Sequence, residues 1–200
     1  MTSIAPVKIS GDWFQGFALD LHTISSTLLG YDEFGHEVFD TKRSEMGELL
    51  YKLKYRQDKS VLNEILEVAT NFVKGKWGIA KVLDCTVPIP PSNTARAFQP
   101  VLEIARGMSS RLGIPMYEDV LIKGKETPEL KDVYEYSRRL DILENAFTVK
   151  TSLIAGKNIL LFDDLYRSGA TLNVATRVLY HKGKAGKIYV LVLTKTRSKS

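Results

Sequence analysis

The chain has 200 residues, of which 44% are hydrophobic and 26% are charged, and its net charge is +5 at pH 7. These values are ordinary for a soluble globular protein with one domain, or one domain and a small appendage. No apolar run approaches the ~20 residues that a membrane-spanning helix needs, so we do not expect the chain to be a membrane protein.

A secretory signal is not expected either, because the first residues lack a basic region followed by an apolar core. The only cysteine, Cys85, excludes an internal disulfide and a cysteine-based zinc site. A cytoplasmic protein is therefore the default expectation. The positive charge suits a polyanionic small ligand and equally a nucleic acid, and it also suits solubility alone.

Residues 1–43 mix aromatic residues with glycines and predict strands and turns. Phe17, Leu19 and Leu21 alternate with other residues, as on a half-buried strand. We interpret this segment as a small β-rich hood or extension that packs on a main domain formed by residues 44–200.

Two amphipathic helices are expected next, one opening near Ser44 and one over about residues 60–73. The first ends in a run where tyrosines interleave with cations. Lys52 and Arg56 are four residues apart and share one helix face, whereas Lys54 lies elsewhere. A solvated basic face and a contact surface for a ligand both fit this run.

A buried strand is expected within residues 79–91, through Val82 and Leu83 and on to prolines that cannot continue a central ladder. Pro100 suits the first position of another helix, which ends at Gly113.

Residues 117–147 are polar and charged, unlike the regular strand–helix units around them. A long polar segment in such a place is usually either disordered or a functional lid. We favour a lid, because a highly charged ligand has to be enclosed and water excluded. A solvated insertion is the alternative.

The most informative stretch begins with an apolar run, Ile159 to Phe162, that predicts a strand buried on both faces. Asp163 and Asp164 follow at once, and after a short loop the apolar spacing predicts a helix that stops near Gly183. Strands that alternate with helices along the chain predict an α/β fold with a mostly parallel twisted sheet and helices on both faces.

The loop between this strand and helix predicts an anion site. Ser168, Gly169 and Thr171 fall where the first N–H groups of a helix lack partners and the helix dipole is positive. Asp163 and Asp164 would repel a bare phosphate, so they indicate sugar hydroxyls or a magnesium ion on the same ligand. A phosphate and a diol on one molecule describe a ribose 5-phosphate.

This pattern of Asp-Asp, three residues and Ser-Gly-x-Thr resembles the phosphoribosyl pyrophosphate (PRPP) loop of type I phosphoribosyltransferases. One alternative is an ordinary strand–helix turn whose Ser and Thr cap the helix. Another is a phosphoacceptor domain, which would not require Ser-Gly-x-Thr.

Further segments are similar, in the same order, to the competence-associated ComF branch of these enzymes. They are Leu53-Lys54-Tyr55, Val87-Pro88-Ile89-Pro90, Arg96-Ala97-Phe98-Gln99, Thr127-Pro128 with a downstream arginine, and Asn145-Ala146-Phe147. Two departures stand out. ComF proteins usually open with a four-cysteine zinc module, which this chain lacks, and they tend to have Arg-Gly-Phe-Asn in place of Arg-Ala-Phe-Gln.

The resemblance implies a reaction in which a nitrogen nucleophile displaces pyrophosphate from C1 of PRPP. It implies that Asp163 and Asp164 hold the ribose hydroxyls, directly or through Mg²⁺. The implied 5-phosphate contacts are Tyr166, Arg167, Ser168, Gly169, Ala170 and Thr171, and the implied pyrophosphate contacts are Pro88, Ile89, Pro90, Pro91, Arg96, Lys125 and Arg138.

The expected partners are PRPP with magnesium and an unidentified base or amine acceptor. A second hypothesis is a non-catalytic protein related to DNA uptake that binds PRPP or single-stranded nucleic acid, using Lys52, Lys54 and Arg56. A second copy of the chain is a further candidate partner, whereas a membrane is not.

Overall fold

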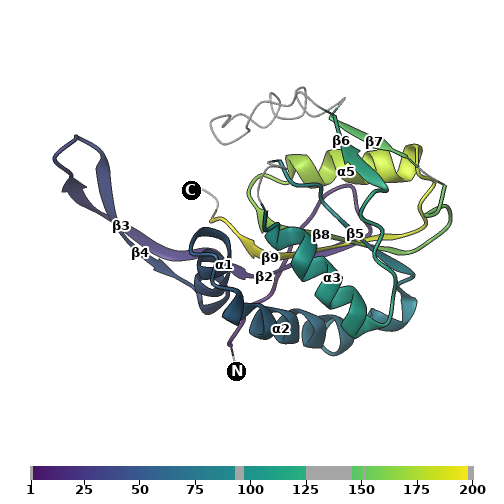
Figure 1. The fold of residues 1–200 in the computed structure, drawn as a ribbon, viewed down its shortest axis with the longest axis horizontal. Helices are drawn as coiled ribbons and strands as arrows, with labels where there is room; N and C mark the ends of the chain where they lie inside the picture. Colours follow the sequence, from purple (N-terminus) through teal and green to yellow (C-terminus); the bar gives the residue numbers. More distant parts are fainter. Residues whose placement is uncertain (1, 93–96, 125–145, 151, 198–200) are drawn as a thin grey trace.

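A five-stranded sheet forms the centre of the computed structural model (Figure 1). The structure describes residues 2–92, 97–124, 146–150 and 152–197. Across the sheet the order is β1 (Val7–Lys8), β2 (Gln15–Leu21), β9 (Ile188–Lys195), β8 (Ile159–Tyr166) and β5 (Cys85–Pro88). Only the β1–β2 pair is antiparallel, so the predicted mostly parallel sheet is confirmed.

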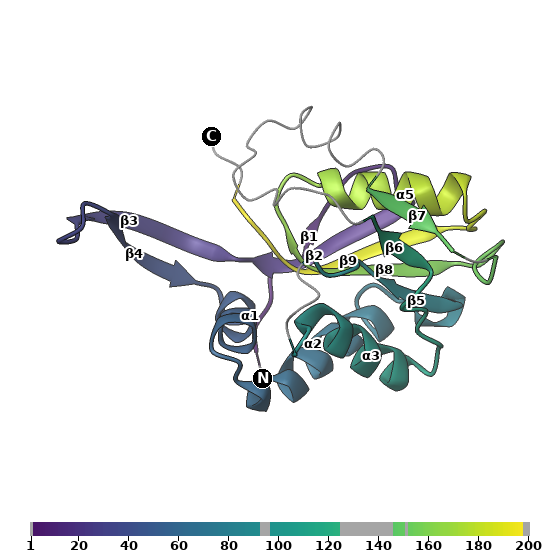
Figure 2. The same cartoon turned by 45° about the horizontal axis from the view of Figure 1, so that its top comes forward.

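Helices cover both faces of this sheet, as the alternating pattern predicted (Figure 2). On one face lie α1 (Glu45–Tyr55), α2 (Leu62–Lys74) and α3 (Pro100–Leu112), and on the other lies α5 (Ala170–His181). Each face has its own apolar core, because successive residues of β8 and β9 point to opposite sides. None of the helices in the described ranges is long and apolar enough to cross a bilayer.

The predicted helix ends are confirmed where a specific cap defines them. The Ser44 Oγ accepts a hydrogen bond from the backbone N–H of Gly47 at 2.9 Å and so begins α1. Pro100 occupies the first turn of α3, and Gly113 ends that helix in a left-handed conformation with φ of 72°.

The N-terminal segment contributes to the central sheet, which differs from the prediction that residues 1–43 pack on the domain as a hood. β2 runs parallel to β9, with Phe17 beside Leu191, and it is buried on both faces. The sequence pattern looked half-buried because one face carries the small residues Gly16 and Ala18, which leave little apolar signal.

The strand predicted through Val82 and Leu83 begins later than expected. Residues 80–82 form a short 3₁₀ helix, η2 (Ala80–Val82), and the Val82 side chain is exposed. β5 begins at Cys85, since its pairing partner β8 begins only at Ile159. A second 3₁₀ helix, η1 (Lys59–Val61), precedes α2.

Residues 23–43 form a separate two-stranded sheet that projects from the body of the molecule (Figures 1 and 2). We call this hairpin the arm; it consists of β3 (Thr23–Tyr31) and β4 (Glu37–Arg43). At its tip, the Asp32 carboxylate accepts hydrogen bonds from the backbone N–H groups of Phe34 and His36.

A third, small antiparallel pair joins β6 (Leu121–Lys123) to β7 (Phe147–Val149). The backbone N–H of Gly124 donates to the carbonyl of Ala146 at 2.7 Å. The predicted lid, residues 117–147, therefore has its two described ends side by side. Its centre, with the predicted helix start at Thr127, lies outside the described residues.

Candidate functional site

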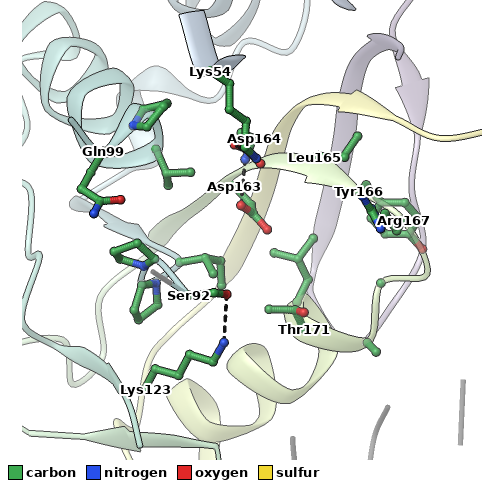
Figure 3. A pocket seen from close by; sticks show the side chains of 18 of the residues that line it. Lys54, Ser92, Gln99, Lys123, Asp163, Asp164, Leu165, Tyr166, Arg167 and Thr171 are labelled. Atoms are coloured by element: carbon green, nitrogen blue, oxygen red, sulfur yellow. Dashed lines mark hydrogen bonds and ion pairs between the residues drawn. The ribbon is translucent and has the colours of Figure 1, made fainter. Parts of the chain in front are cut away.

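A pocket of about 330 Å³ opens at the carboxyl ends of β5 and β8, where ligands bind in open α/β sheets. Its lining comes from five parts of the chain (Figure 3). They are the end of α1 with Lys54 and Tyr55, residues 89–92, residues 99–101, residues 163–172, and the β6–β7 pair with Lys123 and Phe147.

The two aspartates lie inside β8, which continues to Tyr166 instead of stopping at Phe162 as predicted. Asp163 pairs with Val192 and Leu165 with Thr194, because β9 is long enough to extend the ladder past the acids. Successive strand residues point to opposite faces, so the two carboxylates leave the strand in different directions.

Asp164 points toward α1 and forms an ion pair with Lys54 (Figure 3). The Lys54 Nζ donates to the Asp164 Oδ2 at 2.6 Å, and only 8% of the Asp164 side chain is exposed. Burial lowers the pKa of Lys54, but the Asp164 charge and hydrogen bond outweigh it, so that pKa is raised overall. Lys54 therefore stays protonated and fixes this carboxylate.

The surroundings of Asp163 offset less of its negative charge. Burial and the negative charge of Asp164 raise its pKa to about 7, against the opposing effects of the Asp164 backbone N–H, Lys54 and Lys123. Its Oδ1 accepts that N–H at 2.8 Å. An additional cation beside the pair would relieve the repulsion between the carboxylates.

Magnesium fits this donor set. Mg²⁺ is commonly held by one or two carboxylates together with waters and substrate phosphates. Within the described ranges no group of three or more His, Cys, Asp or Glu side chains could hold a metal by itself. Asp163 and Asp164 would therefore hold the ion only together with oxygens of a bound ligand.

The turn from β8 into α5 has the geometry of an anion cradle. Gly169 has a φ of 79°, in the left-handed region that favours glycine, and a Cβ there would meet the Tyr166 hydroxyl at 2.7 Å. α5 begins at Ala170, so its first N–H groups lie beside the pocket that Ser168 and Thr171 also line. The predicted strand–turn–helix context of the motif is confirmed.

The residues predicted for pyrophosphate are brought to the pocket only in part. Ile89, Pro90 and Pro91 line it, and the Ile89 N–H donates to the Phe162 carbonyl at 2.8 Å. Pro88 does not belong to the lining, because it is the last residue of β5 and is buried there. Arg96, Lys125 and Arg138 lie outside the described residues.

Sequence reasoning did not assign Lys123 and Gln99 to the site, although both line the pocket. The Lys123 Nζ donates to the Ser92 Oγ at 2.9 Å (Figure 3). Each lies far in sequence from the aspartates, and a lysine in a polar segment carries no local signal that would have singled it out.

The three cations predicted as basic contacts separate in space. Lys54 lines the pocket, whereas the Arg56 guanidinium lies 5.7 Å from the centre of the Tyr51 ring. The Tyr51 and Tyr55 rings lie 5.3 Å apart between their centres. Lys52 and Arg56 are not lining residues, and the role of the three cations as basic contacts stays a prediction.

His22, to which the sequence gave no role, lies close to the acids. Its Nδ1 is 3.1 Å from the Thr194 Oγ1 at the ends of β2 and β9. Burial lowers its pKa, the charges of Arg43, Lys54 and Arg167 lower it further, and Asp164 opposes them. A lone histidine at the end of a short strand gives no sequence signal for this placement.

The comparisons with known proteins match this geometry. No family model matches the chain. The competence protein ComFC of Bacillus subtilis (strain 168) is 31% identical over 157 residues, which cover 78% of this chain and 62% of ComFC. The chain therefore spans less than two thirds of that relative.

Two solved structures share the fold at low sequence identity. One is the glutamine PRPP amidotransferase of B. subtilis, solved with ADP and GMP, with 15% identity, a TM-score of 0.50, and coverage of 80% of this chain and 34% of that one. The other is the adenine phosphoribosyltransferase of Trypanosoma brucei, solved with AMP, pyrophosphate and ribose-5-phosphate, with 13% identity, a TM-score of 0.50, and coverage of 94% and 73%. The chain is similar in sequence to ComFC, and its fold is that of the type I phosphoribosyltransferases.

Proposed function

We propose that the protein is a phosphoribosyltransferase that binds Mg-PRPP in this pocket and transfers its ribose 5-phosphate to a nitrogen acceptor. One observation carries the proposal. The buried Asp164, the half-buried Asp163 next to it and the glycine turn at the start of α5 line the same pocket. A ligand that carries a diol and a phosphate needs both the carboxylates and the turn.

The phosphate end of the ligand would lie on the turn from Tyr166 to Thr171. The N–H groups at the start of α5 point toward an anion there, and the helix dipole favours negative charge. Gly169 lets the backbone approach closely. The exposed Arg167 adds a cation at the same edge.

The ribose end would lie on Asp163 and Asp164, whose oxygens accept hydrogen bonds from the 2- and 3-hydroxyls. When bound, magnesium supplies positive charge that offsets the two carboxylates and the pyrophosphate. The hydrogen bond from Lys54 holds the Asp164 carboxylate in place. The acids are therefore positioned before the ligand arrives.

The transfer itself asks for little covalent work by the protein. The nitrogen lone pair forms the bond to C1, the bond from C1 to the pyrophosphate oxygen breaks, and its electron pair leaves with pyrophosphate. The protein positions the reactants and stabilises the charge that develops on the leaving group. Lys123 and residues 89–92 lie on the side of the pocket where that group would leave.

We infer a lid role for the segment that leaves the described part at Gly124 and returns at Ala146. The β6–β7 pair anchors both ends at the pocket, through Lys123 beside Phe147. Closing over the ligand would exclude water, which otherwise competes with the acceptor for C1.

We also infer that the protein is cytoplasmic, which its single buried cysteine favours.

Calorimetric titration of PRPP, with and without Mg²⁺ at low salt, tests the proposal. The chain should bind PRPP only weakly without magnesium, and the double variant Asp163→Asn/Asp164→Asn should lose at least about 100-fold in affinity, about 2.7 kcal/mol. The matched control is Glu103→Gln/Glu118→Gln, which removes two surface carboxylates that pair with Arg106.

Unchanged affinity in the Asn double variant would refute the assignment. Where binding is confirmed, release of pyrophosphate in the presence of a panel of bases and amines identifies the acceptor. Binding without any pyrophosphate release over the whole panel would favour a non-catalytic PRPP-binding protein.

The second candidate function is single-stranded nucleic-acid binding, and the aromatic residues of α1 favour it. Tyr55 is largely exposed, lies at the rim of the pocket and stacks near Tyr51, which Arg43 and Arg56 flank. Aromatic rings beside cations provide a stacking platform for bases. Affinity for an oligonucleotide should then fall steeply with salt and with Tyr55→Ala.

A further inference from the structure

The arm has more exposed apolar surface than a free hairpin can hold in water. Its outer half carries Leu28, Leu29, Tyr31, Phe34, Val38 and Phe39, whose exposed fractions lie between 40% and 75%. An isolated two-stranded hairpin is at best marginally stable in water. Exposed apolar surface of this kind is typical of a site that another surface covers.

These apolar residues lie on both faces of the arm. Leu28 pairs with Phe39, so those two side chains share one face. Val38 precedes Phe39 and points to the other face, and a register shift between Leu28 and Gly30 adds Leu29 to the strand. The outer arm therefore presents apolar side chains on each of its two faces.

The charge of the arm changes along its length. Residues 28–41 contain four acids and neither lysine nor arginine, so the outer arm carries −4 while the rest of the chain carries +9. A nucleic acid is therefore an unsuitable partner for the tip, because its phosphates would be repelled. A basic protein surface suits both the acids and the apolar residues.

Such a surface lies at the base of the same arm. Lys42 and Arg43 end β4, Lys52 and Tyr55 lie in the last part of α1, and Arg56 follows as its C-cap. The Arg43 guanidinium lies 3.8 Å from the centre of the Tyr51 ring and 3.6 Å from the Glu48 carboxylate. These contacts join the base of the arm to α1 in one aromatic and basic surface, which we call the basic shoulder (Lys42, Arg43, Tyr51, Lys52, Tyr55 and Arg56).

We propose that two copies of the chain dimerise by crossing their arms antiparallel, so that each acidic apolar tip docks on the basic shoulder of the partner. When two arms run antiparallel, the acidic tip of each meets the basic base of the other. The contact is thus isologous, because each copy gives and receives the same surface. This inference does not depend on the proposed enzymatic function.

A charge-swap experiment tests the arrangement by analytical ultracentrifugation of the full chain. The wild type should be a dimer at micromolar concentration. A tip variant, Glu33→Lys/Glu37→Lys, and a shoulder variant, Lys52→Glu/Arg56→Glu, should each be monomeric, because like charges then face each other in both contacts.

An equimolar mixture of the two variants should form a heterodimer, since each reversed tip then meets a reversed shoulder and each native tip a native shoulder. Circular dichroism and the melting temperature of each variant check that it is folded. A wild type that stays monomeric up to about 100 μM would overturn the proposal. So would a dimer that survives the tip reversal, or folded variants whose mixture stays monomeric.

Discussion

The pocket and the arm differ in the kind of side chain that the fold leaves without a complementary partner: charged groups in the pocket and apolar groups on the arm. In the pocket, Asp164 is buried against Lys54, and burial together with the negative charge of Asp164 raises the pKa of the adjacent Asp163. On the arm, large apolar side chains face solvent. Buried excess charge indicates a charged ligand, whereas exposed apolar area indicates a protein surface.

They also differ in how their residues are held. The pocket is fixed by contacts between distant parts of the chain, such as Lys54 with Asp164 and Ile89 with Phe162. The arm is held mainly by pairing between its own two strands. Substitutions in the pocket should therefore change both stability and ligand binding, while those on the outer arm should change association alone.

Removal of the lysine in the pocket should have the largest effect. Lys54→Met leaves the buried Asp164 without its ion-pair partner, and we expect a loss of about 3 kcal/mol in unfolding free energy. Lys52→Met, two residues away on the same helix, should change it by less than about 0.5 kcal/mol. Urea unfolding of both variants makes the comparison, and equal losses would contradict the role of Lys54.

On the arm, Leu29→Ser/Phe34→Ser should weaken dimerisation about 100-fold with little change in monomer stability, because both side chains are exposed in the single chain. Val82→Ser, which removes an exposed apolar residue from the body, is the matched control. Sedimentation gives the dimer affinity and thermal melting gives the stability. A large drop in monomer stability would mean that the arm packs on its own body.

The glycine turn can be tested with a pair of glycines that share the same backbone conformation. Gly169→Ala and Gly113→Ala both place a Cβ at a φ near 75°, so each should cost about 1–2 kcal/mol in stability. Only Gly169→Ala brings that Cβ against Tyr166 beside the pocket, so it alone should weaken PRPP binding, by about tenfold. Calorimetry on both variants separates the two effects, and equal PRPP affinities would remove Gly169 from the site.

The stability of the ligand-free protein should depend on pH through Asp163. Its pKa is about 7 when folded and near the ordinary 3.8 when unfolded, so the folded state holds the proton more tightly. Stability should therefore fall as pH rises from about 4 to 7. Asp163→Asn should melt a few degrees higher than the wild type at pH 7.5 and similarly at pH 4.5. A difference in melting temperature between Asp163→Asn and the wild type that is the same at both pH values would contradict this dependence.

The smallest effect is expected at Cys85. Burial raises the pKa of its thiol to about 11, so little thiolate forms at neutral pH. A thiol reagent at pH 7.5 should leave the native protein unlabelled and react at once after denaturation. Rapid labelling of the native protein would show that the strand pair around Cys85 opens.

The parts of the site whose chemistry is local could be predicted from the sequence. The two acids, the glycine turn and the helix start lie within a dozen residues, and so they were readable before any tertiary contact was known. The helix starts at Ser44 and Pro100 are local in the same sense, since Ser44 accepts a hydrogen bond from an N–H within the first turn and Pro100 needs no N–H partner in its first-turn position.

Contacts between distant residues became known only from the folded structure. No local pattern could assign Lys54 to Asp164, 110 residues away, or tell it from its neighbour Lys52 as the residue of the pocket. The sequence of β2 looked half-buried because the small residues Gly16 and Ala18 give little apolar signal on one of its faces. Pairing with β9 placed the strand inside the sheet. Periodicity reports how much apolar surface a segment has, but the packing of the other segments determines what covers it.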